Sequence, residues 1–228
     1  MGIIGLLPAA GKATRIGGIP KWLLPVPEGT LLDVHCQRMR LAGVSHVLVA
    51  AGEHNRDLML QHVPANAIVY EGRSRTMAED VLLARPYIGD NEVLFGMPDT
   101  YFGDADTYKY LTYFIPQEDV RIALWPIQDD QRGKLGQCHV DEGTGLVDHV
   151  VDKDPTCTYE WAWGAIAWKP SFWQYIKPDM PHIGYALQPA IGAGLRITAV
   201  IPDGEYTDCG TPEAYWRLCS TFVKEAVR

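Results

Sequence analysis

The chain has 228 residues, a formal net charge of −8 and a pI near 5.3. A chain of this length fits one large α/β domain, or at most two small ones. The acidic balance offers no basic surface for a polyanion, and no apolar run reaches membrane length, so we expect neither nucleic acid nor a membrane among its partners.

The first half of the chain alternates strand-like apolar runs with amphipathic stretches. The predicted strands cover residues 2–7, 44–51, 67–70 and 92–95, and the predicted helices cover residues 31–42, 56–62 and 76–84. The β-α-β-α order with short connections predicts a mostly parallel mixed sheet with helices on both faces. In such sheets ligands bind beyond the carboxyl ends of the strands.

The pattern changes from about residue 120. Further strands are predicted at residues 121–126, 146–152, 163–168 and 196–201. Aromatic residues are dense here, and we interpret them as core packing in preference to a platform for stacking a ligand. The second half is therefore predicted to extend the same sheet. We expect one domain over residues 1–228, with a nucleotide-binding half at 1–119 and a half at 120–228 that binds the second substrate and completes a metal site.

Cysteines and histidines suggest no zinc site in the sequence. The cysteines are Cys36, Cys138, Cys157, Cys209 and Cys219. Five dispersed cysteines without a CxxC pair indicate reduced thiols and no disulfide framework. The seven histidines show no HExxH spacing and no His/Cys pair of ligand type. With no signal-peptide pattern at the amino terminus, we predict a cytoplasmic protein.

The loop after the first strand is the strongest candidate for chemistry. Small residues at 9–11 let the backbone pass close to a nucleotide, and exposed N–H groups there can hold phosphates. Arg15 and Lys21 add positive charge suited to a developing phosphorane, and we expect Lys21 to be an exposed loop residue. The loop is neither GxxxxGK[ST] nor GxGxxG. On composition alone, such a turn is as often structural as functional.

Two aspartates are candidate metal ligands. Asp99 follows the strand at 92–95, where a carboxylate can hold Mg²⁺, although a turn residue is an equal reading. Asp208 precedes a glycine turn and a helix start at Thr211 and Pro212. Capping explains Thr211 and Pro212 without any function, but it does not explain Asp208.

These segments resemble the signatures of sugar-nucleotide pyrophosphorylases, the sugar-1-phosphate nucleotidylyltransferases. Residues 7–26 are similar to L-A-A-G-x-G-T-R followed by P-K-x-L-L-P-V, and residues 206–215 to W-x-D-x-G-T-P-E. The matching positions of the first signature are Ala9, Ala10, Gly11, Thr14, Arg15, Pro20, Lys21, Leu23, Leu24, Pro25 and Val26. Pro8 departs from the pattern, and Ala13 stands where the family usually has a second glycine. Pro98 displaces the glycine of the family's G-D segment beside Asp99.

The resemblance implies a Rossmann-like, GT-A-like nucleotidyltransferase fold. It implies Mg²⁺-dependent transfer of a nucleoside monophosphate from an NTP to a sugar 1-phosphate, with release of pyrophosphate. Arg15 and Lys21 would be catalytic, and Asp99 and Asp208 would bind Mg²⁺. The implied nucleotide-binding residues are Ala9, Ala10, Gly11, Thr14, Glu71 and Thr76, and the implied acceptor-binding residues are Gly136, Asp152, Lys153 and Gly164.

The choice of substrates is left open by the sequence. A carboxylate at Glu71 can accept the N3–H of uracil or thymine, which faintly favours UTP or TTP. The acceptor could instead be a non-sugar phosphate such as phosphocholine. The chain could also be a non-catalytic nucleotide-sugar-binding protein or a glycosyltransferase, whose D-x-D string occurs at Asp104 and Asp106. The sequence does not predict an oligomeric state.

Overall fold

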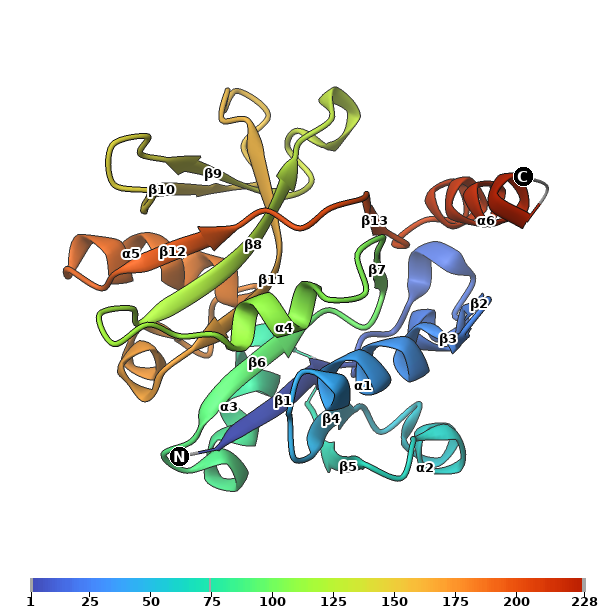
Figure 1. Cartoon of the computed structure of the whole chain (residues 1–228). Helices are drawn as coiled ribbons and strands as arrows, with labels where there is room; N and C mark the ends of the chain where they lie inside the picture. Colours follow the sequence, from blue (N-terminus) through green and yellow to red (C-terminus); the bar gives the residue numbers. More distant parts are fainter. Residues whose placement is uncertain (1, 74, 227–228) are drawn as a thin grey trace.

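A nine-stranded mixed sheet forms the framework of the protein. The computed structural model describes residues 2–73 and 75–226 (Figure 1). The strand order is β10-β9-β11-β6-β1-β4-β5, with β8 on the other edge of β11 and β12 beyond it. The sheet contains strands from both halves of the chain, and the predicted α/β class is confirmed.

Four parallel strands make the amino-terminal part of the sheet. They are β1 (Ile3–Pro8), β4 (Val47–Ala51), β5 (Ala67–Glu71) and β6 (Glu92–Gly96). Each begins and ends within three residues of its predicted range. Alternate side chains enter two separate cores, because successive residues of a strand point to opposite faces. Leu6 packs in one core and Leu7 in the other.

Helices cover both faces of this part of the sheet. Helix α3 (Met77–Ile88) packs its apolar side on the face that contains Leu6, and α1 (Leu31–Leu41) packs on the face that contains Leu7. Threonine caps start both helices: Thr30 forms a capping box with Asp33, and Thr76 accepts from the N–H of Glu79. The helix predicted at 76–84 continues to Ile88 and contains Pro86, so the proline does not end it although it provides no N–H donor.

The second half adds β8 (Val120–Pro126), β9 (Gly136–Val140), β10 (Val147–Asp152), β11 (Trp161–Trp168) and β12 (Ile197–Val200). Strand β8 pairs with β11 along its whole length. The opposite edge of β11 pairs with β9 at Trp161 and Ala162, and with β6 from Ala165 onward. The sheet therefore forks at Gly164.

The remaining elements complete the fold, and most of them were not predicted. The strands are β2 (Pro25–Val26), β3 (Gly29–Thr30), β7 (Thr100–Phe102) and β13 (Tyr206–Asp208). The helices are α2 (Arg56–His62), α4 (Thr107–Thr112), α5 (Leu187–Gly192), α6 (Pro212–Ala226) and the 3₁₀ turns η1 (Thr14–Ile16), η2 (Lys21–Leu23), η3 (Asp129–Gln131), η4 (Pro170–Tyr175) and η5 (Ile183–Ala186). Of these, the sequence predicted α2 and the start of α6.

The carboxy-terminal helix closes back on the amino-terminal loops. Leu218 of α6 packs with Leu24 and Leu31, and Figure 1 shows α6 beside β2 and β3. Among the described residues, none of the helices combines the length and apolar character needed to cross a membrane.

Candidate functional site

The loop after β1 is held by its neighbours before any ligand binds. The N–H of Ala9 donates to the Ala50 carbonyl (3.1 Å), and the buried amide of Asn55 donates to the Ala9 carbonyl (2.9 Å). Sequence reasoning missed Asn55, because its role depends on a loop 46 residues away. A Cβ at Gly11 would meet no protein atom within 4 Å, which leaves the backbone open to a ligand.

Ala13 has a backbone conformation that explains the glycine of the family signature. Its φ is 49° and its ψ is 34°, in the left-handed region. A residue with a Cβ costs about 1–2 kcal/mol there, whereas glycine does not. Ala13 therefore holds a backbone conformation that glycine would adopt at less cost.

A cavity of about 310 Å³ opens beside this loop, beyond the carboxyl ends of β1 and β6. The predicted site residues that line it are Ala9, Ala10, Gly11, Lys21, Thr76 and Asp99. Thr14, Arg15, Glu71 and Asp208 are not among its lining residues. Glu71 is exposed at the end of β5.

Asp80 lines the same cavity and was missed by the sequence analysis. It is buried in the first turns of α3, and its Oδ1 accepts from the N–H of Arg73 (2.7 Å). A Cβ at Gly72 would come within 2.9 Å of both Ala10 and Asp80, so this glycine permits close packing of three segments. An acidic residue one turn after the Thr76 cap was the available signal.

The predicted cation and the first predicted metal ligand form an ion pair. Lys21 Nζ donates to Asp99 Oδ2 over 2.7 Å. The Lys21 side chain is 15% exposed, so the expectation of an exposed loop lysine was wrong. Asp99 lies in a turn that Thr100 closes. The N–H and the Oγ1 of Thr100 both donate to the Met97 carbonyl.

Asp208, the second predicted metal ligand, is the last residue of β13 and lies near Asp99. Strand β13 pairs with β7, with Asp208 opposite Thr100, and the N–H of Cys209 donates to the Asp99 carbonyl (2.8 Å). Burial, and next the charge of Asp99, raise the pKa of the Asp208 carboxyl, while Lys21, the Gly210 N–H and Arg15 oppose the increase. Asp208 therefore lies close enough to interact electrostatically with Asp99, Lys21 and Arg15.

This donor set fits Mg²⁺. Two carboxylates that repel each other offer the hard oxygen ligands that Mg²⁺ prefers, with room for waters and phosphates to complete its shell. The positive charge of Mg²⁺ would offset the burial and the Asp99 charge that raise the pKa of Asp208.

A second polar cluster surrounds Asp152, the last residue of β10. Gly136 is its cross-strand partner in β9. His182 Nε2 lies 2.7 Å from Asp152 Oδ2. Because the Gly184 N–H donates to His182 Nδ1, the proton is on Nε2, which donates to Asp152. His182 had no sequence signal, since its partner lies 30 residues away.

The cluster contains a buried acceptor and a buried donor that no protein group satisfies. Within the described part of the chain, Asp152 Oδ1 and Trp163 Nε1 have no hydrogen-bond partner. A Cβ at Gly136 would collide with Trp163 Nε1 and come within 2.9 Å of Asp152 Oδ1. Buried polar groups are normally paired, so this cluster suits a polar ligand.

The remaining predicted acceptor residues have different environments. Lys153 is exposed and has φ 53°, which is uncommon for a residue other than glycine. Gly164 is buried at the fork of the sheet, where a Cβ would collide with Tyr206 and lie 2.8 Å from Trp125. Core packing alone explains that glycine, and its contact with an acceptor stays a prediction.

The D-x-D string makes local contacts at the start of α4. Asp104 Oδ1 accepts from the N–H of Asp106, and Asp106 pairs with Lys109 at 2.6 Å. These contacts account for both aspartates without a metal.

Comparison with known proteins identifies the family of the chain. Residues 5–192 match the family model described as the MobA-like NTP transferase domain. The low-salt glycan biosynthesis nucleotidyltransferase Agl11 of Haloferax volcanii is 21% identical over 227 residues, which cover 92% of this chain and 63% of that relative. The chain thus spans less than two thirds of the length of this curated relative.

Solved structures share the fold. A UDP-glucose pyrophosphorylase complexed with UDP-glucose is 20% identical, with a TM-score of 0.81 over 99% of this chain and 100% of that one. A Bacillus anthracis protein assigned as a glucose-1-phosphate thymidylyltransferase is 19% identical, with a TM-score of 0.82 over 96% and 94%. The inositol-1-phosphate CTP transferase of T. maritima is 15% identical, with a TM-score of 0.75 over 92% and 90%. At these identities the likeness establishes the fold, and the predicted nucleotidyltransferase fold is confirmed.

Proposed function

Because the chain belongs to the MobA-like NTP transferase family, we propose that it transfers a nucleoside monophosphate from an NTP to a sugar 1-phosphate, with Mg²⁺ as cofactor. The products would be an NDP-sugar and pyrophosphate. The resemblance to a nucleotidyltransferase family, inferred from residues 7–26 and 206–215, is confirmed by the family match. The substrates and the metal are the proposed part.

The observation that carries the proposal is the pairing of Lys21 with Asp99 beside Asp208, at the mouth of a cavity that the glycine-containing loop lines. Phosphoryl-type transfer needs positioning and charge neutralisation more than covalent help from the protein. A lysine and two carboxylates beside the cavity supply those two needs.

In the proposed reaction an oxygen of the acceptor phosphate attacks the α-phosphorus of the NTP. The new P–O bond forms as the bond to the bridging α–β oxygen breaks, and pyrophosphate leaves with that oxygen. When bound by Asp99 and Asp208, Mg²⁺ would neutralise charge on the α-phosphate. Lys21 and Arg15 would stabilise charge that develops on the departing pyrophosphate. The N–H groups near Gly11 would orient the NTP, together with Ala9, Ala10 and Thr14.

The base would lie toward Thr76 and Asp80, which line the cavity. The weak preference for UTP or TTP was based on Glu71, which is exposed and does not line it. Thr76 is held there, because it caps α3 and donates to the Pro178 carbonyl (2.8 Å). The choice of NTP is therefore left to experiment.

A sugar suits the cluster around Asp152 because hydroxyl groups both donate and accept. One sugar hydroxyl could donate to Asp152 Oδ1, and another could accept from Trp163 Nε1, which are the two atoms of this cluster that lack a hydrogen-bond partner among the described residues. Lys153, next along the chain, would attract the phosphate of the acceptor. His182 would hold the Asp152 carboxylate in position.

Phosphocholine is the second candidate acceptor, and one observation favours it. The rings of Trp163 and His182 lie 5.9 Å apart and those of His182 and Tyr185 5.0 Å apart, close to the Asp152 carboxylate. Aromatic faces around a negative charge can bind a quaternary ammonium.

One screen separates these proposals. ATP, CTP, GTP, UTP and TTP are each incubated with Mg²⁺ and with sugar 1-phosphates, inositol 1-phosphate or phosphocholine, and pyrophosphate is measured. We expect release with one NTP and a sugar 1-phosphate, and loss of that release in Asp208→Asn. Release with phosphocholine alone would replace the sugar acceptor. Binding of an NDP-sugar without release from any pair would favour the non-catalytic alternative.

A further inference from the structure

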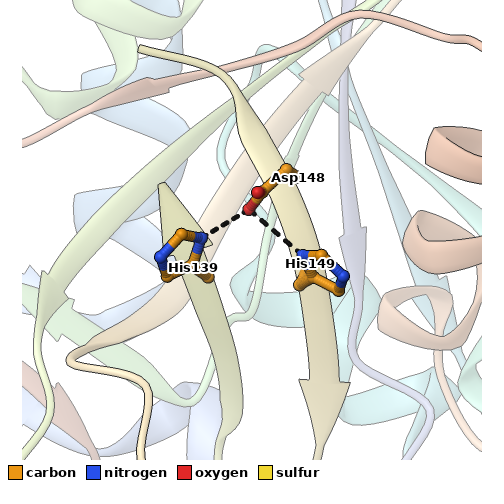
Figure 2. A group of neighbouring side chains, drawn as sticks. All are labelled: His139, Asp148 and His149. Atoms are coloured by element: carbon orange, nitrogen blue, oxygen red, sulfur yellow. Dashed lines mark hydrogen bonds and ion pairs between the residues drawn. The ribbon is translucent and has the colours of Figure 1, made fainter. Parts of the chain in front are cut away.

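A group of metal-ligating side chains lies on the outer face of the β9–β10 hairpin, apart from the cavity. His139 in β9 and Asp148 and His149 in β10 point toward one another (Figure 2). The Asp148 Oδ1 atom lies 2.6 Å from His139 Nδ1 and 3.4 Å from His149 Nδ1. Within the described residues, this is the one group of three His, Cys, Asp or Glu side chains whose ligand atoms all lie within 4.8 Å of one another.

A β-bulge produces this arrangement. His149 pairs with His139, whereas Val147 pairs with Val140, so Asp148 is an extra residue in β10. In a regular strand Asp148 and His149 would point to opposite faces, but a bulge turns two successive side chains toward the same face. Val147 and Val150 remain buried in the core. The bulge therefore adds a carboxylate to the outer face without disturbing the packing beneath it.

We propose that His139, Asp148 and His149 bind a transition-metal dication, with Zn²⁺ as the preferred ion. Two imidazoles and one carboxylate are a common set of three zinc ligands, and solvent or another ligand takes the fourth tetrahedral position. Imidazole selects ions of this class over Mg²⁺, which prefers oxygen. Zinc at about 2.0–2.2 Å from each atom needs the ligands somewhat more than 3 Å apart, so only small side-chain movements are required.

The surroundings suit a bound ion. The three side chains are between 36% and 58% exposed, which gives an ion direct access from solvent. The Tyr159 ring lies 5.5 Å from the ring of His139 and 6.3 Å from that of His149, and it limits their movement. Without a metal, Asp148 Oδ1 forms a hydrogen bond with His139 Nδ1 and lies 3.4 Å from His149 Nδ1, so the three ligand atoms already face one another.

The site would stiffen the hairpin that carries the acceptor cluster. The ligands join β9 to β10 three register positions from the pair of Gly136 and Asp152. Binding to the folded state alone stabilises that state, so Zn²⁺ should raise the unfolding temperature. Protonation of the imidazoles competes with the metal, so affinity should fall as the pH decreases.

Cobalt(II) tests the proposal, because tetrahedral Co²⁺ gives intense visible absorption bands. The protein is titrated with Co²⁺ and then Zn²⁺ in excess Mg²⁺, which occupies Asp99 and Asp208 if they bind it. We expect tetrahedral bands that one equivalent of Zn²⁺ removes. In His139→Ala, His149→Ala and Asp148→Asn the affinity should fall by more than about 10-fold, since even the loss of an outer-shell partner costs that much. His46→Ala, a histidine elsewhere on the surface, is the matched control.

The outcomes are distinct from those of the proposed function. Loss of Co²⁺ affinity in the three variants with unchanged affinity in His46→Ala supports the site, whether or not the protein releases pyrophosphate. Wild-type protein that shows no tetrahedral bands, or equal losses in His46→Ala and His139→Ala, overturns it. If one variant fails to fold, the other two still locate the ion, and a wild-type spectrum without tetrahedral bands overturns the proposal by itself.

Discussion

Lys21 Nζ donates to Asp99 Oδ2 over 2.7 Å, and this bond joins the loop after β1 to the turn after β6. The pair is only partly exposed, so water screens it less than it screens a surface ion pair. Lys21 also opposes the burial and the Asp99 charge that together raise the pKa of the neighbouring Asp208. One ammonium group thus attracts two carboxylates that are 109 residues apart in the sequence.

Replacing Lys21 with alanine should reduce kcat and kcat/KM together, by about 10²-fold or more, because its charge acts mainly in the transition state. The lost ion pair should also cost about 1–3 kcal/mol of stability, between the values for surface and buried pairs. Steady-state kinetics and urea denaturation measure both effects.

Lys21→Arg is the control for charge. Arginine retains the charge but replaces a compact ammonium with a planar fork, so stability should recover more than turnover. Lys21→Ala with normal kcat and reduced stability would make the residue structural and remove the proposed phosphate site.

Asp208→Asn should lose activity without losing stability. Asn keeps the shape but weakens the attraction for Mg²⁺, and we expect turnover to fall by about 10²-fold or more. Burial, and next the Asp99 charge, raise the pKa of Asp208 in the folded state, so ionised Asp208 costs stability at neutral pH. That cost is absent below the unfolded-state pKa. The neutral amide removes it, and the metal-free variant should be as stable as wild type, or more stable, at neutral pH.

Pyrophosphate release at limiting Mg²⁺ and urea denaturation in EDTA test this pair of effects. Asp203→Asn, an exposed carboxylate in the loop before β13, is the matched control and should change neither. An Asp208→Asn enzyme with near-normal turnover at limiting Mg²⁺ is incompatible with the metal assignment.

Lys153→Asn should raise the KM for the phosphorylated acceptor far more than the KM for the NTP. Asparagine tolerates the left-handed conformation that Lys153 adopts at φ 53°, so this change removes the charge with little backbone strain. Lys134→Asn removes a second exposed lysine from the same region and should affect neither constant. Equal effects of Lys153→Asn on both substrates, or no effect, would make Lys153 an ordinary solvated residue.

The buried His35 predicts how stability depends on pH. The Tyr108 hydroxyl lies 2.6 Å from Nδ1, and Nε2 donates to the Thr100 carbonyl (2.9 Å), next to Asp99. Burial lowers the pKa of His35 to about 4, although the bond to Thr100 opposes the decrease. Below about pH 6.5 the unfolded state takes up a proton that the folded state refuses. The free energy of unfolding should therefore decrease by up to about 3 kcal/mol as the pH falls from 6.5 to 4.

His35→Gln lacks that titration and should show a smaller decrease over the same range. Urea denaturation at several pH values gives the free energy of unfolding of both proteins. The carboxylates are the same in both, so their contribution cancels in the difference between the two curves. If stability depended on pH in the same way in the two proteins, the folded and unfolded states would protonate His35 equally, which contradicts a lowered pKa.

Local signals in the sequence predicted the parallel core of the sheet and the loop after β1. Continuous apolar runs indicated β1, β4 and β6, and amphipathic stretches indicated α1 and α3. The predicted ranges were close because propensity, capping and periodicity act over a few residues. The left-handed turn at Ala13 was visible only as a departure from a family signature.

Contacts between distant segments were decided by the tertiary structure. The sequence named Asp99 and Asp208 separately, but only the pairing of β13 with β7 brings them together. Asn55 and His182 had no recognisable spacing, because each meets its partner through tertiary packing. Asp80 had only its position one turn after the Thr76 cap as a signal.

The β9–β10 hairpin shows most clearly how local sequence signals differ from contacts that the tertiary structure decides. The histidines have no metal-binding spacing in the sequence, yet His139 and His149 are neighbours across two strands, and a single bulge adds Asp148. Amino-acid pattern determines which local segments become strands. Register and bulges determine which side chains meet, because a shift of one residue moves a side chain to the opposite face of the sheet.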